Sequence, residues 1–386
     1  MEQEVLVLDG GPLSGPQVVA VARSKCSVDI GPVAIDLMQS AQDVVHAVAT
    51  SGKATYGINT GFGALSTTRI DHDKLTELQM NILRSHAAGV GEPLDEEIVR
   101  GMMVLLAASL CRGMSGSRPE VAQRLAEMLN KGVTPVVPSR GSVGASGDLA
   151  PLAHLALVLC GEGEAMYGEQ TMAGKDAMGE AGITPISPIE KEGLALINGT
   201  HMMASIASLA LADIAILCEA AVTSTAMAID AAKATDTFLD QRLHLARVQS
   251  GQQTVASTLR AHLKGSTIME SHKEGDHRVQ DPYSFRCSPQ VLGASIEAIA
   301  RITGVIAAEL GAVTDNPLVF IADQEIVSGG NFHGMPLAIA MDEFRIALCH
   351  IAGIAERRME WILSARCTYN DLPPFNSKET GLESGL

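Results

Sequence analysis

Apolar residues recur along most of this chain with the period of a helix. Between residues 98 and 112, and again between residues 119 and 130, they recur every three or four positions, which predicts two amphipathic helices. Ser117-Arg118-Pro119 is a suitable start for the second, because proline fits the first turn of a helix. The sequence of residues 4–8 is typical of one short strand. Turns rich in glycine and proline separate the predicted helices, so we predict a mainly α fold.

Three later segments are longer and more apolar. Residues 201–235, 288–313 and 335–366 are rich in Ala, Leu, Ile and Met, which predicts the core of a long-helix bundle. Helices that are apolar around much of their circumference need partners on several sides, so we predict that subunits associate through this bundle. The connecting segments 239–282 and 314–334 contain more Gly, His, Asp and Asn, and are better suited to present functional groups.

These patterns predict two parts. A smaller, loop-rich N-terminal part covers residues 1–200, and the long-helix bundle covers residues 201–386. Hydrophobic residues make up 46% of the 386 residues and aromatic residues only 3%, so the core must consist mainly of aliphatic side chains.

Charge and cysteine content exclude several classes of function. The formal net charge of −16, without any run of Lys or Arg, opposes binding to nucleic acid. Seven widely spaced cysteines without a Cys-x-x-Cys pair indicate reduced thiols rather than disulfides or a zinc site. The acidic N-terminus lacks a secretory signal, and charges such as Asp213 and Glu219 interrupt the apolar stretches. We therefore expect a soluble, cytoplasmic protein without a membrane span or a metal site.

The tripeptide Ala145-Ser146-Gly147 is the strongest candidate for chemistry. The backbone nitrogen of Gly147 is unhindered and could close a five-membered ring onto the Ala145 carbonyl, and loss of water would then turn Ser146 into an electrophilic methylidene. The alternative is a plain turn before a helix. The spacing fits neither a phosphate-binding loop nor a hydrolase nucleophile elbow. Asp148 is a good N-cap for the following helix, whose positive end would then face the loop.

The surrounding sequence, Gly144-Ala-Ser-Gly-Asp-Leu-Ala-Pro-Leu-Ala153, resembles the signature of the aromatic amino-acid ammonia-lyases. The similarity extends through Thr55-Tyr-Gly-Ile-Asn-Thr-Gly-Phe-Gly63, Gln280-Asp-Pro-Tyr-Ser-Phe-Arg286 and Ser328-Gly-Gly-Asn-Phe-His333, and so spans nearly the whole chain. The resemblance implies a helix bundle of the ammonia-lyase and fumarase type, assembled as a homotetramer. It also implies that Ala145-Ser146-Gly147 cyclises autocatalytically to 4-methylidene-imidazol-5-one, without a metal or a diffusible cofactor.

The same resemblance implies roles for further residues, each of which also has a plainer structural explanation. Tyr56 matches the family's general base for the β-proton, and Tyr283 matches a second active-site tyrosine, although either could simply pack in a loop. Arg286 matches the residue that grips the substrate carboxylate, although arginines more often form surface ion pairs.

Three more residues match positions that line the family's active site. Asn198 and Gln280 would help to hold the carboxylate or the prosthetic group, although both could instead cap or turn the chain. Phe332 would pack near the electrophile, although it could be an ordinary core residue.

The pair Ser85-His86 bears on the substrate. Within the family this pair resembles the histidine ammonia-lyases, whereas the phenylalanine and tyrosine enzymes tend to have Phe-Leu and His-Leu. An imidazole offers a donor and an acceptor that match an imidazole substrate, so His86 favours L-histidine. The implied reaction is addition of the substrate amine to the methylidene made from Ser146, removal of the β-proton by Tyr56, and release of urocanate and ammonia.

Two alternatives remain open from the sequence. One is a phenylalanine or tyrosine ammonia-lyase, or the corresponding aminomutase. The other follows from the end of the chain, because family members continue for a further helical segment beyond the point where this sequence stops. In the histidine enzymes that segment carries an active-site glutamate and helices that complete the tetramer. The second alternative is therefore a shortened homologue with impaired catalysis that acts as a structural or binding protein.

Overall fold

The computed structural model describes residues 5–51, 55, 57–60, 70, 74–276, 279–364, 372–379 and 382. Helices account for most of these residues, which confirms the predicted mainly α fold. The chain divides into two compact units, each built from two stretches of sequence. The first unit contains Met1–Ala212 and Val305–Ile339, and the second contains Asp213–Gly304 and Ala340–Leu386.

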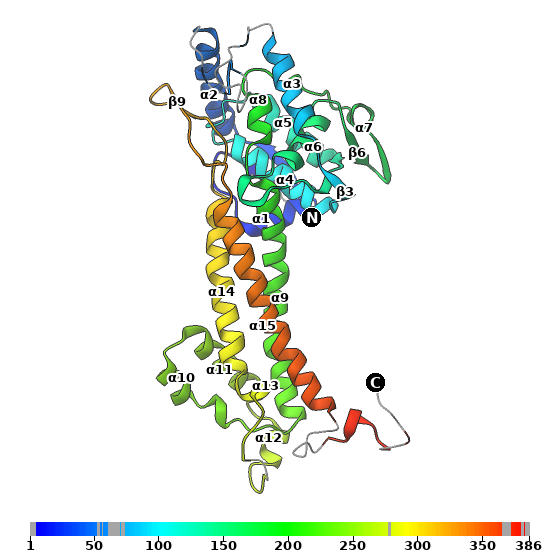
Figure 1. Ribbon diagram of the computed structural model, residues 1–386, viewed down its shortest axis with the longest axis vertical. Coiled ribbons are helices and arrows are strands. Elements are labelled where there is room, and N and C mark those ends of the chain that lie inside the picture. Colours follow the sequence, from blue (N-terminus) through cyan, green and yellow to red (C-terminus); the bar gives the residue numbers. More distant parts are fainter. Residues whose placement is uncertain are drawn as a thin grey trace. The chain divides into compact units, whose positions relative to one another are not determined.

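The first unit consists mostly of short and medium-length helices. These helices are α1 (Gly15–Arg23), α2 (Pro32–Thr50), α3 (Leu75–His86), α4 (Glu96–Leu110), α5 (Pro119–Lys131), α6 (Leu149–Leu159), α7 (Gly174–Glu180) and α8 (Glu192–Ile197). The helices predicted over 98–112 and 119–130 are α4 and α5, whose ends lie within two residues of those positions. In Figure 1, α4 packs against α1 and α5, and α6 packs against α3 and α8.

Short strands connect the helices of the first unit. The strands are β1 (Val5–Leu8), β2 (Ser27–Ile30), β3 (Val90–Pro93), β4 (Thr134–Pro135), β5 (Pro138–Arg140), β6 (Glu164–Tyr167), β7 (Gln170–Ala173), β8 (Leu318–Phe320) and β9 (Glu325–Val327). β1 pairs with β2 in parallel, and the pairs β3–β5, β4–β6, β6–β7 and β8–β9 are antiparallel. The strand predicted at residues 4–8 is β1.

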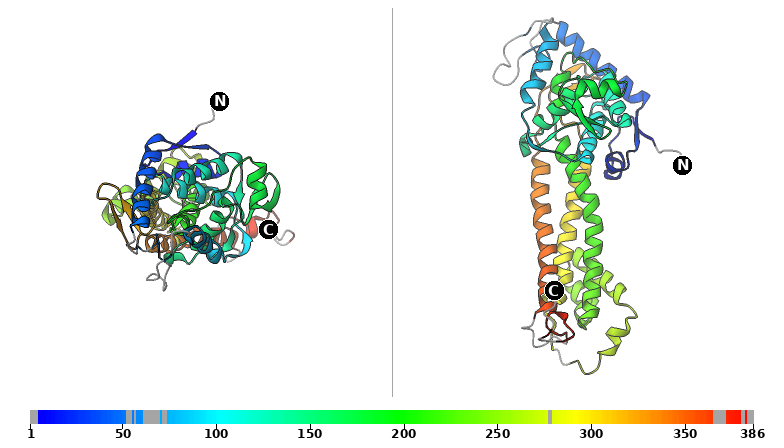
Figure 2. Two further views of the ribbon diagram at one scale, coloured as in Figure 1. Left: turned by 90° about the horizontal axis from the view of Figure 1, so that it is seen from above. Right: turned by 90° about the vertical axis from the view of Figure 1, so that its right-hand side faces the viewer.

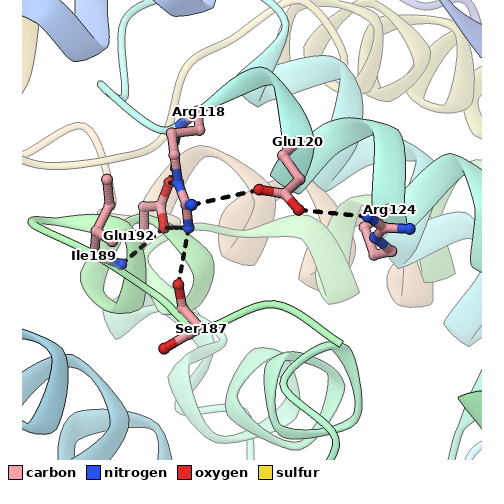
Figure 3. A network of polar contacts seen from close by, with 6 residues as sticks. All are labelled: Arg118, Glu120, Arg124, Ser187, Ile189 and Glu192. Atoms are coloured by element: carbon pink, nitrogen blue, oxygen red, sulfur yellow. Dashed lines mark hydrogen bonds and ion pairs between the residues drawn. The ribbon is translucent and has the colours of Figure 1, made fainter. Parts of the chain in front are cut away.

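A buried ion pair joins the start of α5 to the start of α8 (Figure 3). The Glu192 carboxylate is fully buried and accepts bonds from Arg118 Nε at 2.9 Å and Arg118 Nη2 at 2.8 Å. The same carboxylate accepts the main-chain N–H groups of Arg118 at 3.0 Å and Ile189 at 2.9 Å. Pro119 begins α5 as the sequence predicts, and Glu192 satisfies the backbone donor just before it.

Replacement of Glu192 by alanine is expected to lower the free energy of unfolding by about 3–5 kcal/mol, because it removes the buried carboxylate that accepts from Arg118 and from two backbone donors. Chemical denaturation would measure the loss. Glu120→Ala is the matched control, because Glu120 also pairs with Arg118 but is about half exposed. That change should cost less than about 1 kcal/mol. Equal losses of unfolding free energy in the two variants would show that burial of the Glu192 carboxylate does not strengthen its pairing.

Three long helices contribute residues to both units. α9 (His201–Ala231), α14 (Ser288–Glu309) and α15 (Met335–Leu363) confirm the three predicted long helices. α9 and α14 end four residues earlier than predicted. After α9 the chain turns at Lys233, whose φ of 48° is left-handed and cannot continue a helix. The predicted end of the third segment, at residue 366, lies outside the described residues.

The second unit is built on the parts of α9, α14 and α15 that run side by side in Figure 1 and in the right-hand view of Figure 2. Its shorter helices are α10 (Gln241–Arg247), α11 (Ser250–Leu263), α12 (Thr267–Ser271) and α13 (Tyr283–Arg286). α13 docks on α15 through an edge-to-face contact between Phe285 and Trp361, whose ring centroids are 5.2 Å apart. Arg358 Nε donates to the carbonyl of Ser284 at 3.0 Å, and burial lowers the pKa of Arg358 to about 10.

Two helical stretches, Glu192–Ala231 and Ser288–Glu309, are long and apolar enough to cross a membrane by length and composition alone. This differs from the expectation that no segment resembles a membrane span, because Asp213 and Glu219 interrupt α9 too sparsely to break its apolar run. Core helices of soluble proteins share this length and composition, so the two stretches do not by themselves indicate a membrane protein.

Candidate active site

The Ala145-Ser146-Gly147 loop is a single 3-10 turn, Gly144–Ser146, followed by Gly147. The carbonyl of Ala145 accepts the N–H of Gly334 at 2.7 Å, and Gly147 donates to the carbonyl of Gly144 at 2.8 Å. The Ser146 side chain is exposed on this chain, whereas Gly147 is buried. The Ser146 side chain is therefore exposed, while hydrogen bonds from Gly334 and within the turn hold the loop backbone.

Only glycine fits at position 147. Its φ is +104°, and a Cβ there would lie 3.3 Å from the carbonyl oxygen of Gly199 and 3.5 Å from that of Phe332. Gly199 also accepts the N–H of Asp148 at 2.9 Å. The structure thus brings together three sequence motifs that the chain separates widely, those around residues 145, 199 and 332.

Asp148 corrects one expectation. It occupies the N-cap position of α6, but its side chain makes no capping bond to that helix. Instead Oδ2 accepts the N–H of Met203 in the first turn of α9 at 2.9 Å, and Oδ1 accepts from Ser142 Oγ at 2.6 Å. Burial raises the pKa of the Asp148 carboxyl, and these bonds oppose the rise. Asp148 therefore caps α9 and ties both ends of the loop to it, which no local pattern indicates.

Asn198 follows α8 directly and is buried. Its Nδ2 donates to the carbonyl of Asn316 at 3.0 Å and to Asp315 Oδ1 at 3.3 Å. Phe332 is half-buried, and the next residues lead to Gly334, which binds the loop. Asn198 and Phe332, both predicted as site residues, thus lie on segments that contact the loop.

His86 is the last residue of α3. Its Nδ1 lies 2.8 Å from the carbonyl oxygen of Ile82 and 3.2 Å from Ser85 Oγ. Three residues later, Gly89 packs against the start of the loop, since a Cβ on Gly141 would lie 3.3 Å from the Gly89 Cα. The chain therefore reaches the segment before the loop three residues after the Ser85-His86 pair.

His154 is a supporting residue that the sequence analysis missed. It lies on α6, and its Nε2 accepts the N–H of Gly89 at 3.1 Å, which requires neutral imidazole nitrogen at that position. Burial lowers the pKa of His154 and so favours that neutral form. A single histidine on an apolar helix gives no sequence signal of such a contact.

Three further predicted residues, Gln280, Tyr283 and Arg286, lie in the second unit within one short stretch. The Arg286 guanidinium stacks on the Tyr283 ring, with Cζ 4.4 Å from the ring centroid. Arg286 Nε donates to the carbonyl of Asp281 at 2.9 Å, and the Asp281 side chain is itself bound by Thr235. Tyr283 and Gln280 are exposed on this chain. Tyr56 lies outside the described residues.

No group of three or more His, Cys, Asp or Glu side chains that could hold a metal ion occurs within the part of the chain that the structure describes. The polar groups of the candidate site are instead donors and acceptors arranged around a glycine-rich turn.

Comparison with known proteins identifies the family. The family model described as "Aromatic amino acid lyase" matches residues 13–386. The chain belongs to this family. This lyase is therefore an enzyme, a carbon–nitrogen lyase of the ammonia-lyase type, as the resemblance implied.

Curated relatives and solved structures agree with that family. The lyase is 46% identical over 380 residues to a histidine ammonia-lyase of Gloeobacter violaceus, a match that covers 98% of this chain and 74% of the relative. It is 45% identical over 381 residues to a histidine ammonia-lyase of Geobacillus thermodenitrificans, covering 99% and 75%. The chain thus spans about three quarters of the length of these relatives.

Among solved structures, the lyase superimposes on the histidine ammonia-lyase from Trypanosoma cruzi with a TM-score of 0.87 and 36% identity, covering 99% of this chain and 71% of that one. It superimposes on the Pantoea agglomerans phenylalanine aminomutase with a TM-score of 0.92 and 30% identity, covering 99% and 77%. These matches confirm the predicted helix-bundle fold class of the ammonia-lyases.

Proposed function

We propose that this lyase eliminates ammonia from L-histidine and releases trans-urocanate. The observation that carries the choice of substrate is the bond between His86 Nδ1 and the carbonyl of Ile82. A carbonyl oxygen only accepts, so Nδ1 carries a proton, and in the Nδ1-protonated neutral tautomer Nε2 is an acceptor. That acceptor suits the N–H of an imidazole substrate, whereas a phenyl ring has no N–H to offer. The curated relatives that bear the name histidine ammonia-lyase support the same substrate.

We also propose that Ala145-Ser146-Gly147 forms the 4-methylidene-imidazol-5-one group. The residues present fit such a group. Position 147 admits no side chain, the N–H of Gly334 lies on the Ala145 carbonyl, and Asp148 anchors the end of the turn on Gly199. Once formed, the group supplies an electrophilic methylidene carbon that activates the substrate's amino group as a leaving group.

The chain's own residues would bind and orient the substrate. Arg286 would grip the carboxylate with its planar fork of donors, which the Tyr283 ring orients by stacking. Gln280 would bind beside it, and Phe332 would exclude water next to the loop. Tyr56 would remove the β-proton, a task that requires its phenol pKa to fall below the usual value of about 10.

A homotetramer is part of the proposal. Large apolar side chains on the bundle helices, among them Ile216, Met227, Ile346 and Met359, are each more than half exposed on the single chain. Only 28% and 33% of the most apolar 18-residue segments of Glu192–Ala231 and Ser288–Glu309 are buried within it. Apolar faces of this size favour burial against further copies of the chain. We propose a cytoplasmic location for that assembly.

One assay tests the proposed function. The protein is incubated separately with L-histidine, L-phenylalanine and L-tyrosine. The three conjugated acid products are followed by their ultraviolet absorbance, and β-amino acids are separated by chromatography. We expect urocanate from L-histidine and little product from the others. Cinnamate or coumarate as the main product would favour the phenylalanine or tyrosine enzyme, and a β-amino acid would favour an aminomutase, for which the likeness to the Pantoea enzyme speaks. No product from any of the three would favour a binding protein without catalysis.

Replacement of His86 by leucine is expected to lower kcat/KM for L-histidine by about tenfold to a hundredfold, because the ring acceptor is lost. Activity on L-phenylalanine should change much less or rise. Steady-state kinetics on both substrates measure the ratio. His46→Leu is the matched control, since His46 is an exposed histidine of α2, and it should leave the ratio unchanged. An unchanged preference in His86→Leu would show that His86 does not select the substrate.

A further inference from the structure

A buried ion pair involves Lys191, which lies at the opposite end of α8 from Asn198. Lys191 is fully buried immediately before α8, and its Nζ pairs with Oδ2 of Asp315, which is also buried. The other carboxylate oxygen, Oδ1, accepts the N–H of Asn316 at 2.6 Å and Nδ2 of Asn198 at 3.3 Å. A buried charge pair is costly to desolvate, so its presence is weak evidence for a stabilising role.

The partners of Asn198 decide which way its amide points. Asp315 Oδ1 and the main-chain carbonyl of Asn316 can only accept hydrogen bonds, because the carboxylate is paired with Lys191. The amide nitrogen must therefore face both of them, and the Asn198 Oδ1 atom faces the opposite way. A reversed amide would place three oxygens against one another. The chemistry of these neighbours therefore fixes the amide orientation.

Asn316, next to Asp315, also contacts the segment that binds the Ala145-Ser146-Gly147 loop. Asn316 Oδ1 accepts the N–H of Gly329 at 2.7 Å, in the stretch that leads to Phe332 and Gly334. Gly199, next to Asn198, contacts both Gly147 and Asp148. The Lys191–Asp315 pair is thus connected by hydrogen bonds to the segments that hold the Ala145-Ser146-Gly147 loop.

We infer that Lys191 and Asp315 are positioning residues that fix Asn198 as a hydrogen-bond acceptor, and that Asn198 binds the amino group of the substrate. An oxygen acceptor attracts an amine or ammonium N–H and repels a carboxylate. This differs from the expectation drawn from the resemblance, in which Asn198 helps to hold the carboxylate or the prosthetic group. The inference rests on the proposed histidine-type function, because the probes below carry an imidazole ring.

Two analogues of histidine separate the possibilities in the full-length protein. Histamine keeps the amine and lacks the carboxylate, and 3-(imidazol-4-yl)propionate keeps the carboxylate and lacks the amine. Their dissociation constants are measured by calorimetry, which does not depend on turnover. In Asn198→Ala we expect histamine to bind about tenfold or more weakly, the usual effect of losing a hydrogen bond to a charged group. The propionate should change by less than about twofold.

A charge-balanced double variant, Lys191→Met with Asp315→Leu, tests the positioning role. It removes the acceptor-only oxygen that holds the Asn198 amide without leaving an unpaired buried charge. We expect histamine affinity to fall by at least about threefold while the propionate is unaffected. Glu192→Gln is the matched control, because Glu192 is the neighbouring buried carboxylate and bonds to Arg118 rather than to Asn198. It should lower the Tm and leave the ratio of the two affinities unchanged.

Each other outcome overturns the inference. Loss of propionate binding in Asn198→Ala, with histamine retained, would mean that Asn198 serves the carboxylate and would leave the proposed function intact. An equal shift of the ratio in Glu192→Gln and in the double variant would overturn the positioning role. A wild-type protein that binds neither probe would overturn this inference together with the proposed function, which the urocanate assay tests independently.

Discussion

Replacement of Ser146 by alanine is expected to lower urocanate formation from L-histidine by at least about a thousandfold, because covalent activation of the amino group is lost. Alanine has no hydroxyl to leave, so the methylidene carbon cannot form. The exposed position of Ser146 on a turn whose backbone is held by Gly334 and Gly199 predicts that the variant keeps its fold. Ultraviolet detection of urocanate gives the rate, and the unfolding temperature checks the fold.

Mass spectrometry provides a second reading of the same prediction. The wild-type peptide that contains Ser146 should be lighter than its sequence by two water molecules, and the Ser146→Ala peptide should not show that loss. Ser139→Ala, the same substitution in β5 outside the loop, is the matched control and should keep both the activity and the lighter peptide. An unmodified wild-type peptide from freshly folded protein would refute the proposed prosthetic group.

The second large effect is expected at Arg286. Arg286→Lys keeps the positive charge but loses the planar fork and its stacking on Tyr283, so KM for L-histidine should rise by about a hundredfold. If the contact serves substrate binding and the transition state alike, kcat should fall much less than kcat/KM. Steady-state kinetics over a wide range of histidine concentration separate the two parameters.

Arg242→Lys is the control for that change, because Arg242 is an exposed arginine of the same unit that pairs with Asp240. The substitution should leave KM within about twofold, as expected for an exposed ion pair. A normal KM in Arg286→Lys would show that Arg286 does not clamp the carboxylate. The stacking on Tyr283 would then be a structural contact of α13.

Local sequence patterns were sufficient for α4, α5 and the three long helices. The period of apolar residues located α4, α5 and the three long helices, because an amphipathic or apolar helix carries its signal within its own residues. The same patterns did not locate the ends of the helices to the residue. The left-handed turn at Lys233, which follows α9, has no apolar period that a sequence pattern could detect. The Ala145-Ser146-Gly147 loop was also recognisable, because its chemistry depends on three adjacent residues.

The features of the site that the sequence did not predict depend on contacts between distant segments. Asp148 has the sequence position of a cap for α6, yet it binds Met203 in α9, 55 residues away. The resemblance to the family identified Asn198 as a site residue but not the orientation of its amide. That orientation depends in part on Asp315, which pairs with Lys191, 124 residues earlier in the chain.

By itself, the sequence determined that this chain is a mainly α lyase with an Ala-Ser-Gly loop and a histidine at position 86, because residue identity and local spacing carry that information. Only the tertiary structure decided that Gly89, after α3, lies against Gly141, that His86 Nδ1 is bound to Ile82, and that Asn198 Nδ2 donates to Asn316. Hydrogen bonds of this kind join atoms that lie close in space and far apart in the chain, and a linear pattern does not encode such contacts.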